Sequence, residues 1–198
     1  MNPGAPVEPH FIDTASGVRL DLDDPRPENI RIEDVAGGLS KVCRFAAQAR
    51  EYYSVAQHAL LVRRLVVESG HSELALAALH HDSHEAYLCD IPKPLKEKIS
   101  AATDVYDQTC AVLDLAIAEA FGFELAEEGS REKDAIKSAD NRAFLMEAAR
   151  LLPDSSEALR QDLELREGKF VGLAPLDKPL PPAEAEAEFL QAHLALTR

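Results

Sequence analysis

Most of the chain after Glu33 carries apolar residues at three- and four-residue steps, the spacing that places them on one face of an α-helix. Serine before such a run, and glycine or proline after it, are typical of helix starts and ends. These signals together predict helices over Glu33–Phe45, Ser54–Gly70, Ser72–Leu88, Thr103–Phe121, Ser130–Leu152 and Ala183–Leu196. In the first of them, Gly37 and Gly38 are expected to soften or break the helix.

The part before Glu33 has a different pattern. Phe11–Thr14 and Val18–Leu22 alternate apolar and polar residues on either side of a short Ala-Ser-Gly turn, which predicts a small β-hairpin. Further along, Pro92 and Pro94 are expected to end the third helix, because a residue before proline is pushed out of the helical region.

The fold predicted from this order is all-α, a helical bundle with a small N-terminal β-hairpin. Residues 1–32 form a lead-in and the hairpin, 33–174 the helical core, and 175–198 a proline-rich linker with the last helix. Within the core, residues 154–171 are read as a short helix followed by a strand-like stretch at 169–173.

Composition restricts the function classes. With 198 residues, 46% of them hydrophobic, the chain is long enough to bury one substantial core. Its formal net charge of -14 argues against a nucleic-acid polymer or an anionic membrane as partner, although a small anion can enter a locally cationic pocket. No apolar run approaches the ~18 residues of a membrane span. Cys43, Cys89 and Cys110 lack a C-x-x-C spacing and indicate reduced thiols, so we expect a cytoplasmic protein.

Histidine and carboxylate side chains are concentrated in Ala77–Asp90. Three of the seven histidines lie there, together with Asp82, Glu85 and Asp90. The stretch is either a solvated polar face or part of a divalent metal site. On a continuous helix, Glu85 would lie on the same side as His81 and Asp82.

Two residues elsewhere also have apolar neighbours at helical spacing, His58 and Asp140. A single core histidine is more often hydrogen-bonded than a ligand, and a buried carboxylate needs either a basic partner or a metal. Combined with His81 and Asp82, however, they supply two imidazoles and two carboxylates. That set suits a first-row divalent ion with open water positions better than a closed structural zinc site.

At these positions the chain resembles the HD-domain metal-dependent phosphohydrolases, all-helical enzymes that cleave phosphoester bonds of nucleotides. It is most similar to their 5′-deoxynucleotidase group, over about residues 33–148. The resemblance is carried by His58, His81-Asp82 and Asp140 in that order, and by Arg44-Phe45, Ser54–His58, His81–Glu85, Asp90–Lys96 and Ala139-Asp140.

The resemblance implies an HD-domain core whose four patterned residues ligate one divalent ion per chain, with Co, Mn, Fe, Zn, Ni and Mg all open. It implies that Glu85 positions or deprotonates the attacking water, that Arg44 grips the phosphate, and that Asp90 lies near the sugar and the reacting phosphate. The family pattern places a tryptophan beside the arginine, where it crowds the ribose 2′ position. This chain has Phe45 there and contains no tryptophan, so the sugar preference is not implied.

Four other residues near the motif have less defined roles. Lys93 and Lys96 either add positive charge to the substrate site or are solvated loop residues. His84 either protonates the leaving oxygen or, as we favour, orients a neighbour. His80 is expected to be a core or supporting residue.

The expected activity is removal of phosphate from (deoxy)nucleoside 5′-monophosphates by a metal-activated water, a 5′-nucleotidase-like reaction. One alternative is a nucleoside triphosphate or another phosphoester as substrate, and another is a non-catalytic nucleotide-binding or sensor module that the metal stabilises. The expected partner is a small nucleotide. A homodimer is an expectation from the resemblance, with the last helix as candidate contact.

Overall fold

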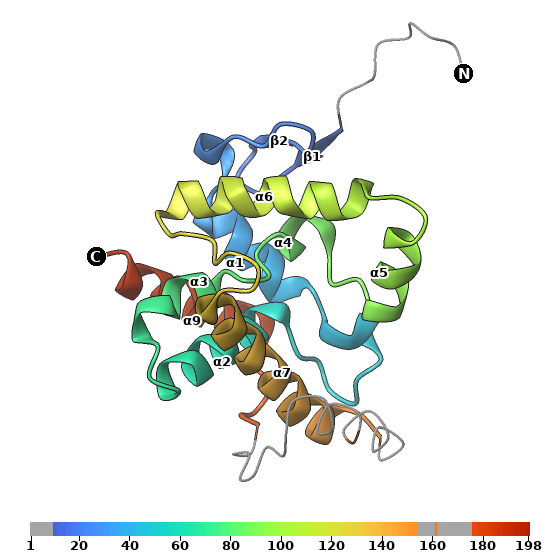
Figure 1. Ribbon diagram of the computed structural model, residues 1–198, viewed down its shortest axis with the longest axis vertical. Coiled ribbons are helices and arrows are strands. Elements are labelled where there is room, and N and C mark those ends of the chain that lie inside the picture. The colour runs from blue at the N-terminus through green and yellow to red at the C-terminus, as the bar shows by residue number, and fades with distance from the viewer. Residues whose placement is uncertain (1–9, 154–160, 162–175) are drawn as a thin grey trace, which may run out of the picture.

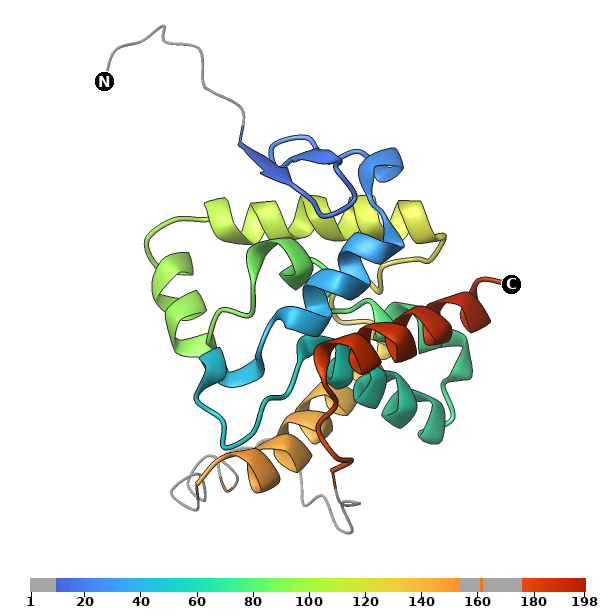
Figure 2. The same ribbon diagram turned by 180° about the vertical axis from the view of Figure 1, so that it is seen from behind.

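The structure is a computed structural model that describes residues 10–153, 161 and 176–198. In this part the protein is mostly helical, with one small antiparallel sheet (Figures 1 and 2). The fold class predicted from the sequence, helical with an N-terminal hairpin, is therefore confirmed. The lead-in at 1–9, the short helix within 154–171 and the strand-like stretch at 169–173 lie outside the described residues.

The elements follow one another along the chain with short connections. They are β1 (Phe11–Asp13), β2 (Arg19–Asp21), η1 (Pro27–Asn29), α1 (Ile32–Lys41), η2 (Arg44–Ala47), α2 (Val55–Glu68), η3 (Ser72–Leu74), α3 (Ala75–Leu79), α4 (Glu85–Leu88), α5 (Lys93–Ser100), α6 (Val105–Phe121), α7 (Arg131–Leu151) and α9 (Pro182–Leu196), where η marks a 3-10 turn.

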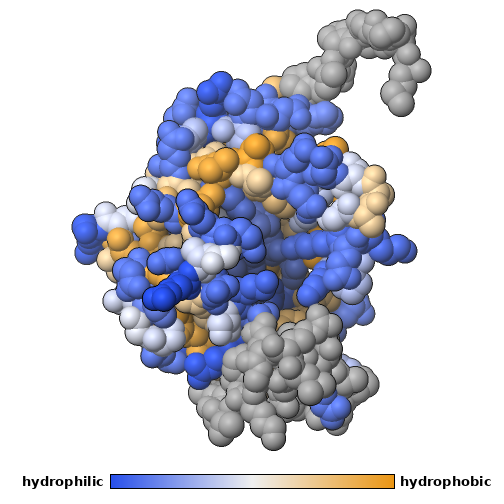
Figure 3. Space-filling view, viewed as in Figure 1, coloured by the Kyte–Doolittle hydropathy of each residue, from blue (hydrophilic) through white to orange (hydrophobic). Residues whose placement is uncertain are grey.

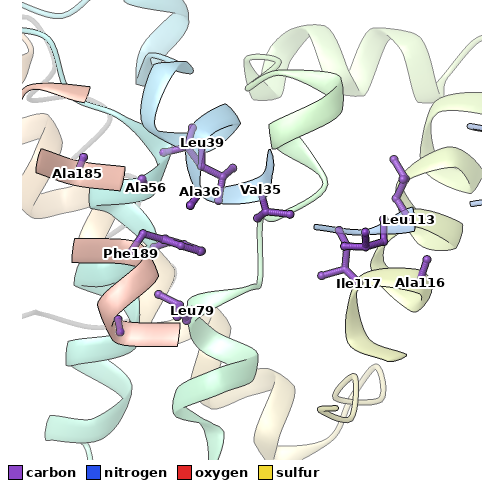
Figure 4. Packing of buried hydrophobic residues seen from close by; sticks show 14 of the residues in the cluster. Val35, Ala36, Leu39, Ala56, Leu79, Leu113, Ala116, Ile117, Ala185 and Phe189 are labelled. Carbon is purple, nitrogen blue, oxygen red and sulfur yellow. The ribbon is translucent and has the colours of Figure 1, made fainter. Parts of the chain in front are cut away.

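Helix α2 is the central helix of the bundle. It packs against α1, α3, α7 and α9. Its first turns join a core shared with α1, α6 and α9, which Figure 4 shows, and its later turns join a second core shared with α3 and α7. The predicted cap is confirmed, because the Ser54 side chain accepts a hydrogen bond from Gln57 N. The start of α2 is thus fixed in the middle of the molecule.

The hairpin is fastened to α1. Ile12 pairs with Leu20 across the two strands, and Gly17 has a φ of 82° in the turn between them. Asp34 of α1 accepts hydrogen bonds from Ser16 N at 2.9 Å and Ser16 Oγ at 2.6 Å. This buried carboxylate therefore holds the turn of the hairpin.

The break predicted at Gly37 and Gly38 is wrong, since α1 runs through both residues and ends at Lys41. A Cβ atom on Gly38 would lie 2.8 Å from the carbonyl oxygen of Ala86 and 2.9 Å from its Cβ. The glycine therefore allows close contact between α1 and the backbone of α4, the helix that begins with Glu85.

The continuous helix predicted over Ser72–Leu88 is also wrong, because it is interrupted between α3 and α4. In the intervening turn, Ser83 N donates to His80 O at 3.1 Å and Glu85 N donates to Asp82 O at 3.0 Å. No proline or glycine marks this interruption in the sequence. The turn contains the His81-Asp82 pair, so the side chains of this pair do not follow helical spacing.

Helix α5 was missed because its prolines were taken only as a stop signal. Pro94 lies in the first turn of α5, where a missing backbone N–H leaves no bond unmade. Lys93 and Lys96 are consequently helix residues and not loop residues.

The later helices agree with their predictions. Helix α6 ends at Gly122, whose φ is 71°, and the Ser130 side chain caps α7 by accepting from Lys133 N. Among the helices of the described residues, none combines the length and apolar character needed to cross a bilayer. The three cysteines are free.

The last helix, α9, packs against its own chain. Ala185, Phe189, Ala192 and His193 are its buried residues, and the helix lies along α1 (Figure 2) and also contacts α2 and α3. A homodimer that uses α9 would therefore have to use its opposite, exposed side, and the homodimer itself stays a prediction.

Candidate metal centre

The four residues of the predicted metal site come from three separate parts of the chain. His58 lies in the first turn of α2, His81 and Asp82 lie in the turn between α3 and α4, and Asp140 lies in the middle of α7. Because α2 packs against both α3 and α7, the four side chains meet. The space-filling view shows a hollow with a hydrophilic floor near the middle of this face, between α6 and α7 (Figure 3).

The potential donor atoms lie close together. His58 Nε2 lies 3.1 Å from Asp140 Oδ1 and 3.6 Å from Asp82 Oδ2, and His81 Nε2 lies 3.1 Å from Asp82 Oδ2 and 3.9 Å from Asp140 Oδ1. Donor atoms of His58, His81 and Asp82 all lie within 4.8 Å of one another. This group can hold a metal ion.

Hydrogen bonding of the two imidazoles fits that role. His58 Nδ1 lies 2.8 Å from Glu147 Oε1, and His81 Nδ1 lies 2.9 Å from the carbonyl oxygen of Ala78. Both contacts favour a proton on Nδ1 and leave the Nε2 lone pair available, the usual arrangement of a ligand histidine. Among the described residues neither buried Nε2 has a hydrogen-bond partner, although carboxylates lie nearby.

The electrostatics show that the cluster requires positive charge. Burial and Arg44 lower the pKa of His58, but Glu147, Asp140 and Asp82 together raise it well above its ordinary value. Burial raises the pKa of Asp82, and the two histidines more than reverse this and hold it well below its usual range. A divalent cation would supply the same charge as protons on the imidazoles, so cation and protons should compete for this cluster.

Glu147 is a site residue that the sequence analysis missed. It is completely buried on α7, where Oε1 contacts His58 Nδ1 and Oε2 accepts from Arg44 Nε at 3.3 Å and Nη2 at 3.1 Å. Burial raises its pKa, but Arg44 and His58 outweigh this and lower it. A signal was present, since Glu147 follows Asp140 by two helical turns and stands between Met146 and Ala148.

Glu85 is almost fully buried at the start of α4. Lys96 Nζ donates to its Oε1 at 2.9 Å, and no partner within the described chain is found for its buried Oε2. Burial raises the pKa of Glu85 to about 7, with further contributions from Asp82 and Asp90, although Lys96 lowers it. Asp90, which is half-buried, also raises the pKa of Arg44, so its charge acts on both residues.

Arg44 and Phe45 begin a strained turn. Burial lowers the pKa of Arg44, but Glu147 and the nearby aspartates raise it above its ordinary value. The guanidinium carbon lies 5.6 Å from the centre of the Phe45 ring, which packs on Phe144. Residues 45–47 have φ values of 59°, 49° and 61°, a left-handed conformation that costs non-glycine residues about 1–3 kcal/mol each and is found mainly at functional sites.

The other predicted residues divide between supporting and exposed positions. His84 Nδ1 lies 2.9 Å from Asp114 Oδ1 of α6; burial lowers the pKa of His84, but this carboxylate and Cys110 raise it to about 10. His80 is buried in the core, as expected for a supporting residue. Lys93 is exposed, and no ion pair joins it to any described residue.

Comparison with known proteins gives relatives but no activity. No protein-family model matches the chain. "Uncharacterized protein YfdR" of Escherichia coli K12 is 41% identical over 112 residues, which span 57% of this chain and 58% of YfdR. "Uncharacterized protein RCAP_rcc00048" of Rhodobacter capsulatus is 37% identical over 194 residues, which span 92% of this chain and 93% of that protein. At that identity and coverage, the chain belongs to the same family as RCAP_rcc00048.

Proposed function

We propose that this protein is an HD-domain metal-dependent phosphohydrolase that removes phosphate from (deoxy)nucleoside 5′-monophosphates. The observation that carries the proposal is the convergence of two buried imidazole Nε2 atoms, without hydrogen-bond partners among the described residues, on the carboxylates of Asp82 and Asp140. The ordered His58, His81-Asp82, Asp140 pattern that resembles this superfamily supports it further.

The donor set suits a first-row divalent ion, with Asp140 proposed as the fourth ligand beside His58, His81 and Asp82. Such an ion lowers the pKa of water and offsets negative charge on a phosphoryl oxygen. The histidines contribute neutral imidazoles, because their Nδ1 protons are directed to Glu147 and to the Ala78 carbonyl.

Glu85 is the proposed proton acceptor. A base works best when its pKa lies near the working pH, and the pKa of about 7 gives Glu85 that property. Lys96 holds one carboxylate oxygen, and Oε2 lacks a partner among the described residues. Oε2 is therefore the atom that we assign to the water proton.

Arg44 and Lys96 are the proposed phosphate contacts. The chain carries a formal net charge of -14, so an anionic substrate needs cationic groups close to the reacting centre. The charge of Arg44 interacts with Asp82, Asp90 and Asp140, and that of Lys96 with Glu85 and Asp82. Both cations thus lie near the carboxylates of the site.

The test is a phosphate-release screen. Ribo- and deoxyribonucleoside mono- and triphosphates are incubated with the protein and with Co²⁺, Mn²⁺, Zn²⁺, Ni²⁺ or Mg²⁺, and phosphate and triphosphate are detected separately. We expect metal-dependent release of inorganic phosphate from monophosphates. His71→Ala is the matched control for His81→Ala, because His71 lies outside the site and contacts only Glu73 among described side chains.

The other outcomes identify the alternatives. Release of triphosphate, or phosphate from triphosphates only, would replace the proposed substrate with a nucleoside triphosphate. Tight nucleotide binding without turnover, with metal bound, would replace the enzyme with a binding or sensor module.

A further inference from the structure

A single buried carboxylate links the proposed cation site to the proposed phosphate contact. Glu147 Oε1 contacts His58 Nδ1 at 2.8 Å, and Glu147 Oε2 accepts from Arg44 Nε at 3.3 Å and Nη2 at 3.1 Å. The side chains of Glu147 and His58 are both 0% exposed, and that of Arg44 is 11% exposed. Each carboxylate oxygen thus serves one of the two partners, out of contact with solvent.

We propose that Glu147 is the positioning residue that fixes His58 for the cation and Arg44 for the phosphate at the same time. The inference rests on the proposed function for the identity of the two ligands. It assigns to this chain one shared anchor, so that a change at the anchor affects both binding events.

The chemistry of the side chain explains why a carboxylate is needed. An ionised carboxylate only accepts hydrogen bonds, so it can accept from the His58 Nδ1 proton and from the Arg44 guanidinium together. A glutamine of the same shape has one oxygen and one NH₂ group, which only donates. Glutamine at this position can therefore satisfy His58 or Arg44, but it cannot satisfy both.

Either choice of the amide has a defined cost. If the amide oxygen faces Arg44, the NH₂ group faces His58 Nδ1 and favours the tautomer with the proton on Nε2, which cannot bind a cation. If the oxygen faces His58, the NH₂ group opposes the N–H groups of Arg44, which must then move. Loss of a partner to a metal-ligating histidine typically lowers metal affinity by about 10–100-fold.

The experiment measures Co²⁺ binding and inorganic phosphate binding to the full-length protein by calorimetry, without any turnover. In Glu147→Gln we expect Co²⁺ affinity to fall by about 10–100-fold. We also expect weaker phosphate binding in the presence of saturating Co²⁺. Glu132→Gln is the matched control, since Glu132 is exposed on the same helix and the charge change is identical.

A second variant separates the shared anchor from a role toward His58 alone. In Arg44→Met, the partner of Oε2 is gone, so the amide of an additional Glu147→Gln can turn its oxygen to His58. We therefore expect Glu147→Gln to reduce Co²⁺ affinity at least about fivefold less in the Arg44→Met background than in the wild type. This interaction between substitutions is not expected if Glu147 only supports the fold.

Each remaining outcome has a definite meaning. Equal effects of Glu147→Gln in both backgrounds would overturn the shared anchor, and so would unchanged Co²⁺ affinity in the single variant. Absence of Co²⁺ binding to the wild type would overturn it together with the metal centre. Because these readouts need no hydrolysis, a protein that binds Co²⁺ and phosphate as expected but hydrolyses no nucleotide would refute the proposed function and leave the anchor standing.

Discussion

Two neighbouring histidines, His80 and His81, have opposite surroundings. Nδ1 of His80 lies 2.8 Å from Ser83 Oγ and its Nε2 lies 3.0 Å from His193 Nδ1, so both ring nitrogens are occupied. Its ring also packs against the aromatic rings of Phe121, Phe123 and Phe189. Burial, with smaller contributions from His193 and His81, lowers the pKa of His80 to about 3.

His81 instead uses one ring nitrogen for the backbone and directs the other to carboxylates. Its Nε2 lacks a hydrogen-bond partner in the described part of the protein and lies 3.1 Å from Asp82 Oδ2. Burial lowers the pKa of His81, but Asp82 and Asp140 raise it. The difference shows that burial alone does not identify a ligand histidine, whereas an unpartnered Nε2 beside carboxylates does.

The largest expected effect comes from His81→Ala. We expect loss of the bound divalent ion and a fall in phosphate release of about 10³-fold or more, since a catalytic metal contributes several kcal/mol to the transition state. Elemental analysis and phosphate release on the same preparation measure both. Full activity in this variant would show that His81 is no ligand and would remove the contrast with His80.

Glu85→Gln should separate chemistry from metal binding. We expect phosphate release to fall by about 10²–10⁴-fold, because a general base is lost, while Co²⁺ affinity is retained. Glu97→Gln is the control on exposed α5. If Glu85→Gln lost the metal as well, Glu85 would belong to the ligand set and not to proton transfer.

His80→Phe should have the opposite effect to a ligand substitution. The ring still packs against the phenylalanines, but His193 Nδ1 and Ser83 Oγ lose their partner, which costs about 1–3 kcal/mol in the free energy of unfolding. Denaturant unfolding measures this cost. Co²⁺ affinity should match the wild type, and a loss of metal comparable to that of His81→Ala would refute the distinction between the two histidines.

The smallest expected effect is a shift of the pH profile. Glu85 must be ionised to accept a proton, so activity should rise with pH through its pKa, which lies at about 7 in the absence of metal. A bound cation favours the carboxylate and lowers that value. Lys96 also lowers it, so Lys96→Met should move the acid limb of the rate profile to higher pH. Lys98→Met, on the same helix, should leave the limb in place.

The sequence predicted the helices better than the turn that bears the chemistry. Starts and ends such as Ser54, Ser130 and Gly122 were correct because caps and turns are local interactions. The interruption between α3 and α4 was missed, since apolar periodicity continues through it. There, contacts with α2 and α7 outweigh the helical preference of the segment.

Grouping of His58, His81, Asp82 and Asp140 was also predictable, because polar residues on apolar faces require partners. Their hydrogen-bond partners were not. Glu147 lies 89 residues from His58 and 103 from Arg44 along the chain, and nothing in local periodicity joins such positions.

The sequence by itself thus determined the helical class, most helix boundaries and the residues able to bind a cation, since these depend on side-chain chemistry and short-range spacing. Only the tertiary structure decided which nitrogen of each histidine is available, and that Glu147 joins His58 to Arg44. The physical reason is that a buried polar group is defined by its partners, and packing between distant segments supplies them.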